Sequence, residues 1–380
     1  MDRERTEYAP CGNCATVRHI QEEVRRVRRA ALLVIGLAVL LSGCATPAAI
    51  SPPAITSVTP SNSGTPNSVV SFGNYEFVSV QGTGQIFTYN ISSESQVLAV
   101  PAYATPCAYP SGMVIATIAG NNVMAVACYD TGSMLTLTVN ADGSLGALGS
   151  VGGLAAPFPG IVLDGTNVLV PLFGSASANG GVAKVSIASP ATPMIEGTVA
   201  LSSPVSGGLA NAEYLAVSGG YIYVTAGSES NPLGSSSTVQ VVNEAAMALV
   251  GSPFVVAHSP QQIAVQGTVI YVTLYDANQL ESIDISNPAS LRQLQVMSLT
   301  TGSQSCHPVP VAVQNNIAYV GCFQEGFIDR IDIGNPSQMQ IISGIAGIQS
   351  PQRLEFAGNS LLVADAASDG KVYQIDLDEF

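Results

Sequence analysis

The chain has 380 residues, with 26 Asp or Glu against 12 Lys or Arg, so its formal net charge at pH 7 is −14. Nucleic acids and anionic lipid surfaces need clustered cations to neutralise their phosphates, so this charge balance argues against both as charge-bound partners. Gly, Ser, Thr, Val and Asn dominate, and no stretch beyond the N-terminal segment holds apolar residues at helical spacing for three turns, so little helix is expected.

The first element in chain order is a targeting segment. A basic run, RRVRR at 25–29, precedes an apolar stretch from Ala31 to Leu41 that is too short to span a bilayer stably. The run Leu41-Ser42-Gly43-Cys44 resembles the bacterial lipobox. This resemblance implies cleavage before Cys44 and lipidation of that cysteine, and Ala45 after it favours the outer membrane. Two or three acyl chains on one residue make a durable anchor.

The N-terminal segment before the basic run carries a C-x-x-C pair, Cys11 and Cys14, with His19 nearby. Such a pair suggests redox or zinc chemistry, but no second pair accompanies it, and the segment would be lost on maturation. We expect translation to start near Val24 or Val27. Removing residues 1–43 removes seven Arg and five acids, which changes the net charge from −14 to −16. Five cations remain: Lys184, Arg292, Arg330, Arg353 and Lys371.

Residues 44–65 are expected to hold the lipidated cysteine, a Pro-rich tether and one short strand, ITSV at 55–58. Residues 66–380 repeat one pattern seven times: an apolar run, a Gly/Asn turn, a Tyr/Val-rich run, a small polar loop and a third run. The turns with their second runs read GNYEFVSV, NNVMAVAC, TNVLVPLF, GGYIYVTA, GTVIYVTL, NNIAYVGC and GNSLLVAD. They recur every 43 to 53 residues. This period predicts an all-β, seven-bladed β-propeller of four-stranded antiparallel blades.

The seventh repeat ends after its third strand, so one strand is missing from the last blade. We expect the N-terminal strand at 55–58 to supply it, because this would close the ring and leave no open sheet edge. The alternative is a plain linker at this place.

YIYVTAG and VIYVTLYDANQLESIDISNPASL resemble the YVTN and LVIVD-type repeats of bacterial extracytoplasmic seven-bladed propellers. The resemblance runs weakly over residues 66–380 and implies the fold. It implies little about function, because these families contain enzymes, binding proteins and uncharacterised members.

Four cysteines remain after the leader and Cys44 are set aside, an even number in an oxidising compartment. In a propeller blade, the residues just before the first strand and just after the second are neighbours. We therefore expect two disulfides, Cys107 to Cys128 in blade 2 and Cys306 to Cys322 in blade 6. A thiolate metal site is disfavoured, because these blades are not adjacent and the thiols would be oxidised.

Six further residues occupy the same two positions and are candidate binding or catalytic groups on this face. His258 and His307 precede the first strands of blades 5 and 6, and four acids follow second strands: Asp130, Asp276, Glu325 and Asp365. If the loops lean inward, His258, His307, Asp276 and Glu325 converge as ligands for a divalent ion or as base and orienting acid. The competing interpretation is ordinary turn chemistry for the acids and solvated histidines.

Two functions follow from these observations. The first is a lipid-anchored, outer-membrane propeller, facing the periplasm or the surface, that presents its top face to an envelope protein or ligand and needs no cofactor. The alternative is a metal-dependent hydrolase of lactonase type at the channel mouth. The G-x-S-x-G, Walker, dinucleotide and H-E-x-x-H patterns are absent. The absence of Trp disfavours quinoprotein-like propellers and weakens a sugar-binding function, which thirteen Tyr still permit.

Overall fold

The computed structural model describes residues 55–59, 64–92, 97–175, 178–203, 209–227, 237–299, 305–367 and 370–378. The predicted leader, the lipobox and Cys44 lie outside the described residues, as does most of the predicted tether. The chain divides into two compact units, Met1–Ile50 and Ser51–Phe380, and the fold described here belongs to the second.

The second unit is built from 28 described strands. In chain order they are β1 (Ile55–Val58), β2 (Thr65–Phe72), β3 (Tyr75–Gln81), β4 (Gln85–Asn90), β5 (Val97–Ala104), β6 (Pro110–Ile118), β7 (Asn121–Cys128), β8 (Ser133–Val139), β9 (Leu145–Gly152), β10 (Val162–Asp164), β11 (Asn167–Leu172), β12 (Gly181–Ser186), β13 (Met194–Ala200), β14 (Asn211–Ser218), β15 (Tyr221–Gly227), β16 (Thr238–Asn243), β17 (Ala248–Val255), β18 (Pro260–Gln266), β19 (Val269–Leu274), β20 (Gln279–Asp284), β21 (Arg292–Ser298), β22 (Pro308–Gln314), β23 (Ile317–Cys322), β24 (Phe327–Asp332), β25 (Gln340–Ala346), β26 (Pro351–Ala357), β27 (Ser360–Asp365) and β28 (Val372–Asp376).

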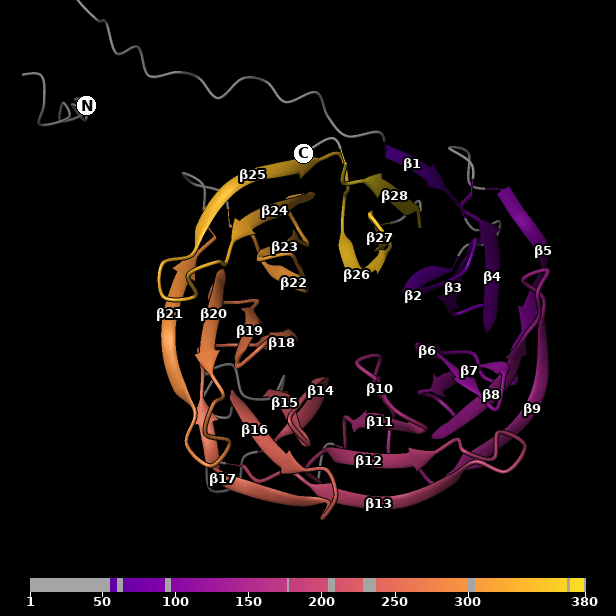
Figure 1. The fold of residues 1–380 in the computed structure, drawn as a ribbon, viewed down its shortest axis with the longest axis horizontal. Coiled ribbons are helices and arrows are strands. Elements are labelled where there is room, and N and C mark those ends of the chain that lie inside the picture. The colour runs from indigo at the N-terminus through magenta and orange to yellow at the C-terminus, as the bar shows by residue number, and fades with distance from the viewer. Residues whose placement is uncertain are drawn as a thin grey trace, which may run out of the picture. The chain divides into compact units, whose positions relative to one another are not determined.

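These strands form seven four-stranded antiparallel sheets, six of which contain four consecutive strands, from β2–β5 to β22–β25. We number these blades 1 to 6, and blade 7 contains β26, β27 and β28. The first strands surround the centre of the ring, and the fourth strands lie on its outer side (Figure 1). The predicted seven-bladed all-β propeller is therefore confirmed. The described residues contain no helix that is long and apolar enough to cross a membrane.

The N-terminal strand closes the ring, as predicted. β1 pairs antiparallel with β28, from Ile55 opposite Ile375 to Val58 opposite Val372. It is the outermost strand of blade 7, so blade 7 also has four strands, and the two ends of the propeller are joined in one sheet (Figure 1). Backbone pairing of this kind covers an edge that would otherwise be open to another chain.

The core lies between the blades, because each sheet is apolar on both faces. Seven clusters of buried apolar side chains occupy the seven junctions between neighbouring blades. The second strand of each blade contributes a fully buried valine at the third or fourth residue from the end of the strand: Val78, Val126, Val170, Val224, Val272, Val320 and Val363. A β-branched side chain suits this position, since it packs well on a pleated surface buried on both sides.

Candidate functional site

The top face is the face at which first strands begin and second strands end. In blades 2 and 6 the paired residues there are Pro110 with Cys128 and Pro308 with Cys322. The loop before each first strand therefore reaches the end of the second strand. Disulfides link Cys107 to Cys128 and Cys306 to Cys322, with Cα–Cα distances of 5.9 and 4.5 Å. These are the two pairs that the sequence predicts.

Two of the four candidate acids hold the top-face loop of their own blade. The Asp130 carboxylate accepts hydrogen bonds from the backbone N–H groups of Ala108 and Tyr109, at 3.0 and 3.2 Å. The buried Asp365 carboxylate accepts them from Gln349 and Ser350, at 3.0 and 2.8 Å. Asp130 follows the second strand of blade 2, and Asp365 is the last residue of the second strand of blade 7. Both bind the segment before the first strand, so they fix the loop geometry of their blades.

The other two acids contact a side chain of the same loop segment. Asp276 accepts a hydrogen bond from the Ser259 hydroxyl in blade 5. Glu325 lies 3.4 Å from His307 in blade 6, measured from Oε1 to Nδ1. Each acid thus contacts a loop residue of its own blade. This arrangement agrees with ordinary turn chemistry and not with one site shared between blades.

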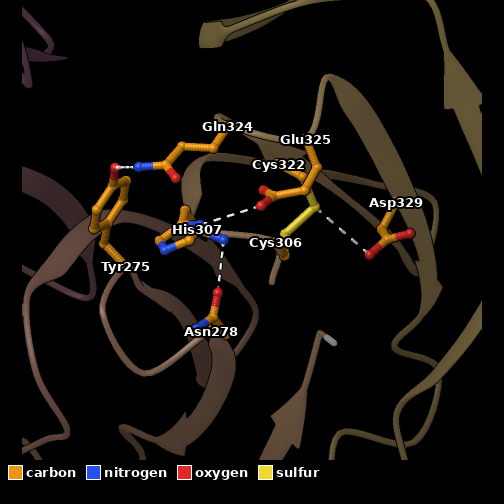
Figure 2. Close-up of polar contacts among 8 residues, drawn as sticks. All are labelled: Tyr275, Asn278, Cys306, His307, Cys322, Gln324, Glu325 and Asp329. Atoms are coloured by element: carbon orange, nitrogen blue, oxygen red, sulfur yellow. Dashed lines mark hydrogen bonds and ion pairs between the residues drawn. A yellow bond between two sulfur atoms is a disulfide. The ribbon is translucent and has the colours of Figure 1, made fainter. Parts of the chain in front are cut away.

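His307 lies at the boundary between blades 5 and 6 (Figure 2). Its backbone N–H donates to Asn278 Oδ1 at 2.8 Å, and its ring lies 5.1 Å from the Tyr275 ring. The Tyr275 hydroxyl accepts a hydrogen bond from Gln324 Nε2 at 2.7 Å. These contacts join blades 5 and 6 beside the Cys306–Cys322 disulfide (Figure 2).

The four residues proposed to converge do not form a metal site with three ligands. In the described part of the chain, one group of three such side chains has its ligand atoms within 4.8 Å of one another, and it contains Cys306, Cys322 and Asp329. Its two sulfur atoms are bonded to each other. His258 is exposed and takes no part in such a group. The donors needed for a structural or catalytic zinc ion are therefore not assembled here.

A cavity of about 530 Å³ opens on the same face. Its walls come from six blades, from first strands and the loops before them and, in blades 1 and 2, also from the ends of second strands. The first strands surround the centre of the ring (Figure 1), so the cavity is the axial mouth of the propeller. We call it the axial pocket. It is lined by Asn67, Gln81, Tyr109, Ser111, Tyr129, Asp130, Phe158, Pro159, Tyr214, Gln261 and Gln352.

One side of the axial pocket is aromatic. The Phe158 ring stands edge-on to the rings of Tyr129 and Tyr214, with centroids 6.3 and 6.2 Å away. It also stacks on Phe173 at 5.0 Å. Tyr109 and Tyr129 are each 39% exposed, so their rings are available at the rim. Aromatic rings in mutual contact hold one another in place and form a rigid apolar wall.

The chain segment 157–160, Pro-Phe-Pro-Gly, brings Phe158 to the pocket. Neither proline has an N–H to donate, so the first strand of blade 3 is interrupted and its regular part begins only at Val162. Gly160 lies directly against blade 4, where a Cβ atom would come within 2.5 Å of Tyr214 Cα. A glycine is therefore required at this close approach.

The axial pocket has a floor. The Gln262 amide donates to the backbone oxygen of Gln352 at 2.9 Å, which links blades 5 and 7. Tyr214 of blade 4 interacts with both glutamine side chains, and burial raises its pKa. Below this level lies a second cavity of about 470 Å³ that includes Glu355 among its lining residues. The axis therefore holds two chambers.

Two ionisable groups near the floor, Arg353 and Glu355, lie close to each other. Arg353 places its guanidinium 5.8 Å from the centroid of the Tyr214 ring. Burial raises the pKa of Glu355, and the neighbouring Arg353 opposes that shift. Neither residue lines the axial pocket. Asp130 is thus the one ionisable carboxylate on its wall, and its oxygens accept the two backbone hydrogen bonds described above.

The candidates chosen from the sequence lie on the same face as the axial pocket, but they include only one of the residues that line it. Of the six histidine and acidic candidates, Asp130 lines the pocket. The aromatic lining residues Tyr109, Tyr129, Phe158 and Tyr214 were not among the candidates. The signal was present for two of these residues, because Tyr109 and Tyr129 lie in CAYP and CYD, next to the disulfide cysteines. The candidates were histidines and carboxylates, so the neighbouring tyrosines were left out.

Comparison with known proteins agrees with the repeat and the fold. The LVIVD repeat model matches residues 210–230, 259–295 and 309–345, which lie in blades 4, 5 and 6. The chain therefore carries LVIVD repeats in these three blades. A search of curated protein sequences gave no match.

Three solved structures illustrate the range of similar propellers. Virginiamycin B lyase from Staphylococcus aureus with quinupristin has a TM-score of 0.62 and 11% identity, covering 85% of this chain and 99% of that one. The periplasmic gluconolactonase of Pseudomonas aeruginosa has a TM-score of 0.62 and 16% identity, covering 78% and 90%. BamB from Moraxella catarrhalis has a TM-score of 0.51 and 12% identity, covering 81% of each chain. At identities this low, the similarity shows a common fold but does not show a common function.

Proposed function

We propose that the chain is a lipid-anchored propeller of the bacterial outer membrane that binds a small, polar ligand in the axial pocket of its top face. Cys44 carries the anchor, and residues 44–54 form the tether. The ligand is a free small molecule or a group on the surface of an envelope protein, which is then the binding partner. The proposal needs no catalytic group or cofactor.

The observation that carries this proposal is the axial pocket itself. It is concave, closed by a floor, and lined by rigid aromatic rings together with several amide side chains. Its volume of about 530 Å³ lies within the range of small-molecule sites, which bury a ligand among apolar walls and orient it with a few polar groups. The loops around it are held by disulfides and by Asp130 and Asp365, so the site is preorganised.

A matched pair of substitutions tests the location. Gln81→Trp places a large ring on the wall of the pocket, and Gln293→Trp places the same ring on the exposed fourth strand of blade 5. A panel of neutral, acidic and basic small molecules is screened by calorimetry against both variants and the unmodified chain. We expect a ligand that binds the unmodified chain and Gln293→Trp but not Gln81→Trp. Binding that survives Gln81→Trp, or no binding at millimolar concentrations, contradicts the proposal.

A hydrolase of lactonase type is the second candidate, and one observation favours it. His307 and Glu325 form a pair in which the carboxylate can orient the imidazole as a general base, with Tyr275 beside the ring (Figure 2). The P. aeruginosa neighbour is a gluconolactonase with the same fold. Glu325→Gln keeps the size of the side chain and removes its charge. If the chain hydrolyses gluconolactone and this substitution abolishes the activity while no ligand binds in the axial pocket, the enzyme hypothesis replaces the binding hypothesis.

A further inference from the structure

We infer that the ligand of the axial pocket is an uncharged saccharide. This inference rests on the proposed function and names the ligand class of the same site. It follows from three properties of the walls: the exposed aromatic rings, the paired donors and acceptors of the amides, and the absence of cationic lining residues.

The aromatic wall suits the C–H faces of a sugar ring. The face of an aromatic ring carries negative electrostatic potential, so it attracts the slightly positive hydrogens of C–H bonds in addition to excluding water from them. Tyr129 and Tyr109 stand at the rim, and Phe158 lies deeper, against Tyr214. A flat, partly apolar ligand therefore finds aromatic surface from the rim down to the floor. Tyrosine serves here in a chain that contains no Trp.

The amide side chains suit hydroxyl groups. Each amide offers a carbonyl acceptor and an N–H₂ donor, and each hydroxyl donates one hydrogen bond while accepting others. Asn67 Nδ2 donates to Gln81 Oε1 at 3.4 Å. Both residues line the cavity, and this contact uses one polar atom of each amide, the Asn67 donor and the Gln81 acceptor. Gln261 of blade 5 and Gln352 of blade 7 add two more amides.

The charge of the site excludes acidic ligands. Among the described residues, no Lys or Arg lines the pocket, and the one carboxylate that lines it, Asp130, would repel an anion. The chain as a whole has a net charge of −14, which adds to this repulsion. A uronic acid, a phosphate ester or a nucleotide is therefore a poor ligand. A cation is not favoured either, because both Asp130 oxygens accept backbone hydrogen bonds.

The floor limits how deeply the ligand enters. Because Gln262, Gln352 and Tyr214 close the axis, a chain of sugar units enters from the solvent with one end and keeps the other end outside. A site of about 530 Å³ accommodates a short oligosaccharide end rather than a polymer segment that passes through the ring.

The test uses isothermal titration of the full-length chain, expressed in a bacterial envelope and purified in lauryldimethylamine oxide, a detergent without a sugar headgroup. The probes are three neutral trisaccharides (maltotriose, cellotriose and chitotriose), the acidic trigalacturonate, and an N-acetylated trialanine amide as a neutral peptide. The variants are Tyr129→Ala, Tyr129→Phe and, as the matched control, Tyr275→Ala on the same face outside the pocket.

We expect at least one neutral trisaccharide to bind, and trigalacturonate to bind at least tenfold more weakly or not at all. Tyr129→Ala should weaken the neutral ligand by about tenfold, whereas Tyr129→Phe, which keeps the ring, and Tyr275→Ala should leave its affinity within about twofold. Tighter binding of the peptide or of trigalacturonate overturns the saccharide assignment. If that tighter ligand is lost in Gln81→Trp, the axial pocket stands as the binding site; if it is not, both proposals fail.

Discussion

Two buried acids stand at equivalent places in neighbouring blades. Glu281 is paired with Val272 in blade 5, and Asp329 with Val320 in blade 6. In blade 4 the corresponding residue is Gln240, which is fully engaged because it exchanges hydrogen bonds with the backbone of Ser202 at 2.8 and 3.0 Å. In Glu281, the buried Oε1 atom has no hydrogen-bond partner among the described residues. Burial raises the pKa of Glu281 to about 7 and that of Asp329 to about 6.

These raised pKa values set the sign of a pH dependence. The folded chain retains protons that the unfolded chain releases near its ordinary carboxyl pKa, so protonation favours the fold. The contribution of Asp329 is complete below about pH 4 and is lost as the pH rises through about 6. For Glu281 the loss extends to about pH 7. The chain therefore becomes less stable from pH 4 to pH 7 as far as these two groups are concerned.

Asp329→Asn tests this directly, because it keeps the shape and removes the titration. We expect the free energy of unfolding at pH 8 to rise by about 1 to 3 kcal/mol, with little change at pH 4, since the buried charge is no longer formed. Denaturant unfolding at both pH values measures it. The matched control is Asp284→Asn. Hydrogen bonds from Ser286 and Arg292 lower the pKa of Asp284, so this substitution should reduce stability at neutral pH. An unchanged slope of stability against pH in Asp329→Asn contradicts the assignment.

At the scale of elements, the top face depends on contacts that tie the loop before a first strand to the end of the second strand of the same blade. Blades 2 and 6 use disulfides for it, while Asp365 in blade 7 uses its carboxylate. In both cases the loop before a first strand is tied to the end of the second strand. Tyr109 and Tyr129 of the pocket adjoin the tied cysteines of blade 2, and Gln352 follows the tied segment of blade 7, so part of the pocket wall obtains a fixed geometry in this way.

Removal of a disulfide should loosen one blade and destabilise the chain. The Cys306–Cys322 bond spans 16 residues, and a loop of this size contributes about 3 kcal/mol in the chain-entropy model. We expect the double substitution Cys306→Ala and Cys322→Ala to lower the free energy of unfolding by about that amount. Ligand binding in the axial pocket should be retained, because blade 6 contributes no residue to its wall.

The matching double substitution in blade 2, Cys107→Ala and Cys128→Ala, separates stability from binding. Its bond spans 21 residues, so the loss of stability should be similar. Binding should weaken as well, since Tyr109 and Tyr129 are the direct neighbours of these cysteines and line the pocket. Equal effects of the two pairs on ligand affinity would count against the pocket as the binding site.

At the scale of the whole molecule, the repeat carried most of the information about the fold. Seven Val-rich second strands at a period of 43 to 53 residues determine seven blades, because each apolar face must be covered by the next blade. The closing strand at Ile55–Val58 was predictable for the same reason, from one missing strand and one unassigned strand-like segment. The disulfide pairs followed once the blade geometry was assumed.

The site was less predictable, for two physical reasons. Loop direction decides whether a top-face residue meets the axis, and nothing in HSP or CHP shows that His258 stays exposed while His307 contacts Glu325. Pocket residues also come from six blades, and Phe158 reaches the axis only because Pro157 and Pro159 interrupt a strand. Such a convergence has no local sequence signature, in contrast to a repeat.

The proposed anchor makes a prediction for the whole chain in a cell. Cys44→Ser removes the thiol that would be acylated, so we expect the protein to lose incorporated radiolabelled fatty acid and to move from the membrane fraction to the soluble fraction. The control is Cys14→Ser, which should alter neither property because the predicted leader is removed. Acylation that persists in Cys44→Ser would refute the lipoprotein assignment.

The most direct test of the account is the structure of the full-length chain crystallised with the best-binding neutral trisaccharide. We expect electron density for the sugar in the axial pocket, with a sugar ring against Tyr129 or Phe158 and hydroxyl groups within hydrogen-bond distance of Gln81 or Gln352. Density beside His307 and Glu325, or on the outer strands, with an empty axial pocket would contradict it.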